Sequence, residues 1–180
     1  MAFRAGPAIP SVSTRTITPF GPETLGLTSM QMILGAYALA AYPAANVAIF
    51  VPMEILQRAI VYEVFWETGS APTGNIDIGI YDRAGTRLAS LGSTAIGSAS
   101  SLNNSTTWTD YTLEPGFYYM AFAHDGTSSL AAVTSPAGLL EACGVCEQTS
   151  AFALPATATL SRTTRAHLPH FGLTVRTEAL

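Results

Sequence analysis

Apolar and polar residues alternate along much of the chain after residue 46, and this pattern predicts β-strands. The clearest case is residues 75–82 (Asn-Ile-Asp-Ile-Gly-Ile-Tyr-Asp), which place isoleucines on one side and Asp77, Gly79 and Tyr81 on the other. A period of two is typical of an antiparallel strand that buries one face. We therefore expect residues 75–82 to form a half-buried strand.

Further runs rich in β-branched and aromatic residues predict the remaining strands. They are residues 47–51, 59–66, 86–91, 107–113, 117–123, 128–133 and 170–177. Residues 82–85 (Asp-Arg-Ala-Gly) predict a hairpin turn, and residues 114–116 (Glu-Pro-Gly) predict a compact turn. Residues 92–106 are expected to be a loop, and residues 134–160 to be irregular apart from a helical turn at 139–142. About eight short strands without helical crossovers indicate an all-β fold, a single antiparallel β-sandwich of jelly-roll-like type.

The first 24 residues predict an extended N-terminal arm, because four prolines and two glycines forbid a long helix there. Within it, residues 11–18 are rich in β-branched side chains and suit one edge strand. We place the sandwich domain at residues 25–180. Residues 25–45 favour a short strand or loop packed on other chains over a long helix, because their periodicity is blurred and Pro43 closes the stretch.

Charge is scarce: 8 basic and 12 acidic residues make up 11% of the 180 positions, against roughly 25% in a usual soluble protein. All eight basic residues are arginines, and the net charge of −4 excludes the basic footprint of a nucleic-acid-binding protein. A surface with so little charge is expected to be covered by neighbouring subunits.

A membrane span is considered because residues 24–53 carry no charge and exceed the ~20 residues that cross a bilayer. Two prolines, Gln31 and Asn46 interrupt this stretch, and no basic flank anchors either end. A buried segment of a globular or assembled protein is the preferred interpretation. The N-terminal residues show no apolar signal-peptide core.

Two cysteines and two histidines are the candidate metal ligands. Cys143 and Cys146 form a Cys-x-x-Cys pair, and His167 and His170 form a His-x-x-His pair. Together they have the donors of a zinc site, but the 20 residues between the pairs and the short histidine spacing depart from the finger pattern. A disulfide is a second possibility, and a pair of small, partly buried thiols is preferred; we expect no metal and no cofactor.

Catalytic groups are sought among the acidic residues and serines. Asp77, Asp82, Asp110 and Asp125 lie on predicted strand exteriors or in turns, where aspartate commonly serves turn geometry. Their spacing fits neither a calcium loop nor a carboxylate pair. No serine lies in a Gly-x-Ser-x-Gly elbow, and no glycine motif is suited to phosphate. We expect a protein without enzymatic activity.

Aromatic side chains are the stronger functional signal, because too many are present for one core to bury them all. They are Tyr62, Trp66, Tyr81, Trp108, Tyr111, Tyr118 and Tyr119. Exposed rings stack on the apolar faces of sugars, and they also concentrate at subunit interfaces. The scarcity of charge favours subunit contact.

Three motifs resemble small β-sandwich proteins encoded among the structural genes of tailed phages. They are residues 44–52 (Ala-Ala-Asn-Val-Ala-Ile-Phe-Val-Pro), residues 74–88 (beginning Gly-Asn-Ile-Asp-Ile-Gly-Ile-Tyr-Asp) and residues 113–121 (Leu-Glu-Pro-Gly-Phe-Tyr-Tyr-Met-Ala). The resemblance covers residues 40–177 and implies a virion component, in the head decoration, neck, tail or a fibre, often trimeric and without catalysis.

The sequence thus predicts a virion structural protein that acts through contacts with copies of itself, a trimer being favoured, and with other virion proteins. The expected contact residues are Ile9, Val12, Ile17, Phe20, Trp66, Tyr81, Trp108 and Tyr111. The alternative is a carbohydrate-binding module for attachment to a host surface, in which Trp66 or Trp108 would stack on glycan rings.

Overall fold

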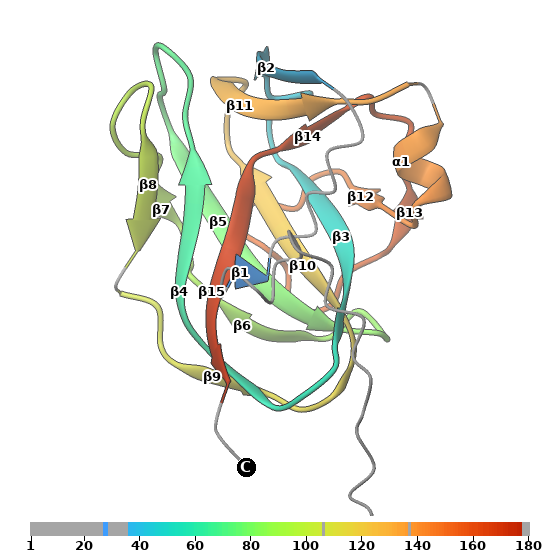
Figure 1. The fold of residues 1–180 in the computed structure, drawn as a ribbon. Helices are drawn as coiled ribbons and strands as arrows, with labels where there is room; N and C mark the ends of the chain where they lie inside the picture. The colour runs from blue at the N-terminus through green and yellow to red at the C-terminus, as the bar shows by residue number, and fades with distance from the viewer. Residues whose placement is uncertain (1–26, 29–35, 106, 137, 178–180) are drawn as a thin grey trace, which may run out of the picture.

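The computed structural model describes residues 27–28, 36–105, 107–136 and 138–177, and its strands form three antiparallel sheets (Figure 1). The seven-stranded sheet has the order β13-β12-β3-β10-β5-β6, with β7 beside β5. Its strands are β3 (Val47–Ile55), β5 (Asn75–Asp82), β6 (Arg87–Ser90), β7 (Thr94–Ala95), β10 (Gly116–His124), β12 (Cys146–Gln148) and β13 (Ser161–Arg162).

Two further sheets complete the fold. The five-stranded sheet has the order β1-β15-β4-β8, with β9 also beside β4, and the three-stranded sheet has the order β14-β11-β2. Their strands are β1 (Leu27–Thr28), β2 (Ala36–Ala41), β4 (Ala59–Glu67), β8 (Leu102–Ser105), β9 (Tyr111–Leu113), β11 (Ser129–Thr134), β14 (His167–Pro169) and β15 (Phe171–Thr177). The helix in the described ranges is α1 (Leu139–Ala142).

One hydrophobic core joins the two larger sheets. Phe122 of β10 and Phe171 of β15 meet with ring centroids 5.2 Å apart, and both side chains are fully buried. Ile76, Ile78 and Ile80 of β5 face the same core. Burying these side chains removes apolar surface from water, at about 25 cal/mol per Å², and so stabilises the packed sheets. The predicted all-β antiparallel sandwich is confirmed.

The outer face of β5 departs from the prediction. The expectation that this strand is half-buried is wrong, because Asp77, Gly79 and Tyr81 are buried as well. Residues 151–158 lie across this face and bury a second, smaller apolar cluster against the sheet, to which Leu154 contributes. Both faces of the middle of the large sheet are therefore covered.

The predicted hairpin after β5 is confirmed. The amide of Gly85 donates to the carbonyl of Asp82 at 3.1 Å, and the amide of Thr86 donates to the Asp82 carboxylate at 2.8 Å. Gly85 has a φ of 87°, a left-handed conformation that glycine adopts without strain. The chain thus reverses at residues 82–85 and returns as β6.

Several other expectations need correction. The strand predicted at residues 107–113 is confined to β9, the predicted loop at 92–106 contains β7 and β8, and the irregular stretch at 134–160 contains β12. The helical turn at 139–142 is confirmed, and the described part of residues 25–45 forms the short strands β1 and β2. The predicted arm contacts, Ile9, Val12, Ile17 and Phe20, lie outside the described residues.

Candidate functional site

The outer face of the seven-stranded sheet is only partly covered, and its open part carries aromatic side chains. Along β10, alternate residues point to this face, so Phe117 and Tyr119 lie outward while Met120 and Phe122 enter the core. Tyr119 lies between Pro52 of β3 and Tyr81 of β5 in the register of the sheet. Phe117 and Tyr119 therefore form an aromatic strip on β10, at the part of the sheet face that residues 151–158 leave open.

Two hollows adjoin this strip and share Tyr119. The smaller, about 190 Å³, is an aromatic groove lined by Pro52, Arg83, Phe117, Tyr118 and Tyr119. Phe117, the second residue of β10, is 58% exposed, which is unusual for a phenylalanine side chain on a sheet face. The Tyr118 hydroxyl donates to the carbonyl of Glu114 at 2.9 Å, and this bond fixes the ring at one side of the groove.

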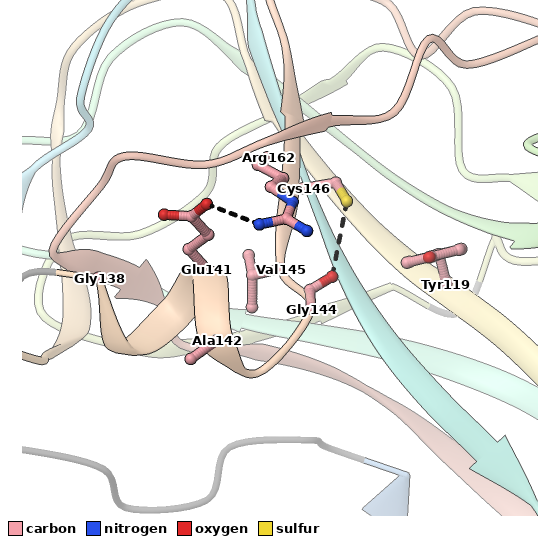
Figure 2. A pocket seen from close by; sticks show the side chains of 8 residues that line it. All are labelled: Tyr119, Gly138, Glu141, Ala142, Gly144, Val145, Cys146 and Arg162. Carbon is pink, nitrogen blue, oxygen red and sulfur yellow. Dashed lines mark hydrogen bonds and ion pairs between the residues drawn. The ribbon is translucent and has the colours of Figure 1, made fainter.

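The larger hollow, about 610 Å³, lies between Tyr119 and α1 (Figure 2). Arg162 of β13 donates to the Glu141 carboxylate of α1 at 3.2 Å. The Cys146 thiol donates to the carbonyl of Gly144 at 3.5 Å, and burial raises its pKa although Arg162 opposes the rise. Because thiolate is the reactive form, this cysteine is not activated as a nucleophile.

The cysteine and histidine pairs do not come together as a metal centre. Cys143 and Cys146 are both free thiols, one exposed and one partly buried. His170 contacts the carboxylate of Glu67 at 2.7 Å, whereas His167 contacts the hydroxyl of Thr134. Among the residues that the structure describes, no three His, Cys, Asp or Glu side chains gather as they would around a metal ion.

The predicted aromatic contact residues divide into two groups. The expectation that Trp66, Tyr81 and Trp108 are exposed is wrong, because all three rings are buried. The polar group of each ring has a hydrogen-bond partner within the fold. Trp66 Nε1 donates to the carbonyl of Ile96 at 2.6 Å, and Trp108 Nε1 donates to the carbonyl of Val61 at 3.2 Å. The Tyr81 hydroxyl donates to the carbonyl of Pro155 at 2.6 Å. These rings therefore stabilise the sandwich and cannot stack on a glycan.

The remaining aromatic residues keep some exposure. Tyr111 of β9 is partly buried against the core, and Tyr62 of β4 is exposed beneath the guanidinium of Arg176, 5.8 Å from the ring centroid. Phe117, which the sequence did not single out as a contact residue, is more exposed than either tryptophan. In the sequence, Phe117 follows a Pro-Gly turn and precedes two tyrosines, and this position was the feature that could have indicated an exposed aromatic residue.

Asp77 is the most enclosed of the candidate acidic residues. The expectation that it lies on a strand exterior is wrong, since its side chain is fully buried beneath residues 151–158. Burial raises the pKa of Asp77, while donors from Ser90, Leu154 and Gly92 oppose the rise. These donors lie 2.8–3.0 Å from its oxygens, so the carboxylate ties the covering segment to the β5–β6 hairpin.

Asp125 has a similar structural role at the end of β10. Burial acts to raise its pKa, but hydrogen bonds from the backbone and side chain of Asn75, together with His124, outweigh that effect and lower it. The bonds from Asn75 measure 2.8 and 2.9 Å. Asp77 and Asp125 are therefore both engaged in holding loops, which is the structural role that the sequence favoured for the acidic set.

A second exposed feature is the outer edge of the three-stranded sheet. β2 pairs with β11 along its whole length, and within the described ranges it has no strand on its other side. Its six residues, Ala-Tyr-Ala-Leu-Ala-Ala, contain neither a charge nor a proline, and Leu39 at its centre is 56% exposed. Unpaired backbone groups on such an edge are a template for another strand.

Comparison with known proteins adds no family assignment. No protein-family model, curated protein or solved structure matches this chain. Within the described ranges, no helix is both long enough and apolar enough to cross a membrane.

Proposed function

We propose that this chain is a non-enzymatic structural component of a bacteriophage virion, a capsid decoration, neck or tail protein. It acts through contacts with copies of itself, a trimer being favoured, and with other virion proteins. The observation that carries the assembly part of this proposal is the outer edge of β2, which has no charged residue and, within the described ranges, no strand beside it. The resemblance of residues 40–177 to tailed-phage sandwich proteins supports the virion setting.

The other sheet edges make β2 stand out. β1 and β13 have two residues each, β8 is four residues long with two asparagines, β6 begins at Arg87 and β14 ends in a proline. Short length, charge and proline are the devices by which proteins protect edges from further pairing. Because β2 alone among these combines six residues with no charge and no proline, it is the edge on which a partner strand is expected.

The composition of the surface supports the same function. Leu39, Leu56, Leu102 and Phe117 are each more than half exposed, and only 11% of the chain is charged. Water-exposed apolar side chains and few charges favour burial against another protein surface. A monomer with this surface would be prone to nonspecific association, whereas a subunit of a particle would not.

A charged side chain on the β2 edge is expected to weaken the association of subunits without unfolding the domain. Leu39→Lys places a charge in the middle of the edge, where pairing with another strand would bury it. We expect the dissociation constant between subunits to rise at least roughly tenfold, or about 1.4 kcal/mol, in sedimentation or native mass spectrometry.

Leu102→Lys is the matched control, because Leu102 is 62% exposed on β8, in a different sheet. Unchanged circular dichroism of both variants would show that the fold is kept. Equal effects of the two substitutions on assembly, or none from Leu39→Lys, would contradict a role for this edge.

A second candidate function is carbohydrate binding, and the larger hollow favours it. Tyr119 offers a ring for stacking at one side, while Glu141 and Arg162 offer polar groups at the other. Sugars are bound by this combination of an aromatic face and hydrogen-bonding side chains. Saturable binding on a glycan array, lost on Arg162→Ala, would support this function, and Trp66 or Trp108 would have no direct role.

A further inference from the structure

We propose that the aromatic groove binds residues 7–10 (Pro-Ala-Ile-Pro) of a neighbouring copy of this chain. The proposal rests on the proposed function, in which subunits contact one another, and it assigns a receptor surface to the N-terminal arm. The groove is the hollow of about 190 Å³ lined by Pro52, Arg83, Phe117, Tyr118 and Tyr119.

The chemistry of the groove suits a proline-rich segment. Rings of tyrosine and phenylalanine present flat apolar faces, and proline rings pack on them with little loss of entropy because a polyproline II helix is already extended and stiff. Phe117 and Tyr119 lie two residues apart on one face of β10, which places them about 7 Å apart along the strand. They form two adjacent platforms.

The sequence of the arm offers a matching ligand. Residues 7–10 and 19–22 are both Pro-x-x-Pro segments. A polyproline II helix has three residues per turn and rises 3.1 Å per residue, so the two prolines of each segment lie on one edge, about 9 Å apart. Gly21 interrupts the second segment and loosens it, whereas residues 7–10 contain no glycine. The first segment is therefore the better ligand.

Charge gives the bound segment a direction. Residues 1–22 carry two arginines and no acidic residue, whereas residues 23–180 carry six arginines and twelve acidic residues. Arg4 lies three residues before Pro7, and a polyproline II helix that continued through Gly6 would place it on the same edge as both prolines. Glu54 is exposed and lies opposite Phe117 in the register of β3 and β10, while Arg83 comes from the turn after β5. We expect the segment to bind in the direction that brings Arg4 near Glu54 and keeps it away from Arg83.

The test uses the full-length chain carrying Pro7→Ala and Pro10→Ala, so that its own arm cannot fill the groove. A fluorescent peptide of residues 1–22 is titrated into it and followed by anisotropy. We expect saturable binding that Tyr119→Ala or Phe117→Ala in the receiving chain weakens at least tenfold, whereas Leu102→Ala, at an exposed position on another sheet, leaves it unchanged.

Variant peptides test the chosen segment and its direction. Pro7→Ala with Pro10→Ala in the peptide should abolish binding, while Pro19→Ala with Pro22→Ala should leave it. Arg4→Glu in the peptide should weaken binding, and Glu54→Arg in the receiving chain should restore it in part. The proposal is overturned if Tyr119→Ala and Phe117→Ala leave the affinity for the peptide unchanged, or if the binding curve does not saturate.

Cross-linking separates contact between copies from contact within one copy. In a chain with Cys143→Ser and Cys146→Ser, one preparation carries Ile9→Cys and another carries Arg83→Cys, and a short bismaleimide is added to their mixture. Covalent dimers of the two preparations are expected. A third preparation carries both Ile9→Cys and Arg83→Cys in one chain. If cross-links form only within that chain and not between the two single-substitution preparations, the contact between copies is overturned. If the peptide fails to bind while Leu39→Lys still dissociates the oligomer, the assignment of the groove is wrong and the proposed self-assembly stands. If the peptide binds but the chain is monomeric, the groove does bind the segment and the proposed self-assembly is wrong.

Discussion

Asp77→Ala is expected to lower the free energy of unfolding by about 2–4 kcal/mol, because it deprives one buried donor and two partly buried donors of this acceptor. The donors are the Ser90 hydroxyl and the amides of Gly92 and Leu154. Losing the last of these frees the segment that covers Tyr81 and Phe50, so the outer apolar cluster becomes exposed as well. Urea denaturation measures the first effect, and hydrogen exchange at the amide of Leu154 measures the second.

Asp110→Asn is the matched control for this substitution. Asp110 is an exposed carboxylate paired with Arg176 at 2.8 Å, and a surface pair of this kind contributes at most about 1 kcal/mol. A loss of stability from Asp77→Ala no larger than that from Asp110→Asn would contradict the anchoring role of the buried carboxylate.

The contribution of Asp77 to the free energy of unfolding depends on pH, and the direction of that dependence follows from its pKa. Because burial raises the pKa of Asp77 in the folded chain, the folded state keeps this proton to a higher pH than the unfolded state does. The contribution of Asp77 to stability is therefore largest below its ordinary pKa of about 3.9 and declines as the pH rises through the raised value. The destabilisation caused by Asp77→Ala should accordingly be greater near the acidic end of that window than at neutral pH.

Deletion of residues 1–22 is expected to leave the sandwich folded and to abolish incorporation of the chain into particles. Among the residues that the structure describes, the main core is built by side chains from Tyr42 onward, and the truncated chain keeps all of them. Complementation with the truncated chain, followed by measurement of the protein content of purified particles, tests this. Circular dichroism and the midpoint of thermal unfolding establish that the truncated domain is folded.

A full-length chain with Pro7→Ala and Pro10→Ala refines the deletion. It keeps the length of the arm and removes only the segment assigned to the groove, so reduced incorporation would point to that contact. Normal incorporation of the truncated chain would contradict a role for the arm in assembly.

The strands that could be predicted from the sequence are those whose alternation is reinforced by a local turn. The isoleucines of β5, the turn at residues 82–85 and the return along β6 specify one another over sixteen residues of sequence, and the structure agrees. β8 could not be predicted in the same way, because its residues (Leu-Asn-Asn-Ser) lack β propensity and owe their strand to pairing with β4.

The candidate site was harder to predict because burial depends on segments distant in sequence. Alternation places Asp77 and Tyr81 correctly on the side of β5 opposite the isoleucines, but nothing nearby shows that residues 151–158 cover that side. The same limitation applies to Trp66 and Trp108, whose nitrogen atoms find carbonyl acceptors at Ile96 and Val61. Phe117 remains open because the covering segment reaches only part of the sheet face.

Native mass spectrometry of the full-length chain over a range of concentrations is the most direct test of whether this protein acts through self-assembly. We expect a discrete homo-oligomer, a trimer being favoured, that Leu39→Lys shifts toward monomer and Leu102→Lys does not. A chain that stays monomeric at every concentration, with Leu39→Lys indistinguishable from the natural sequence, would contradict it.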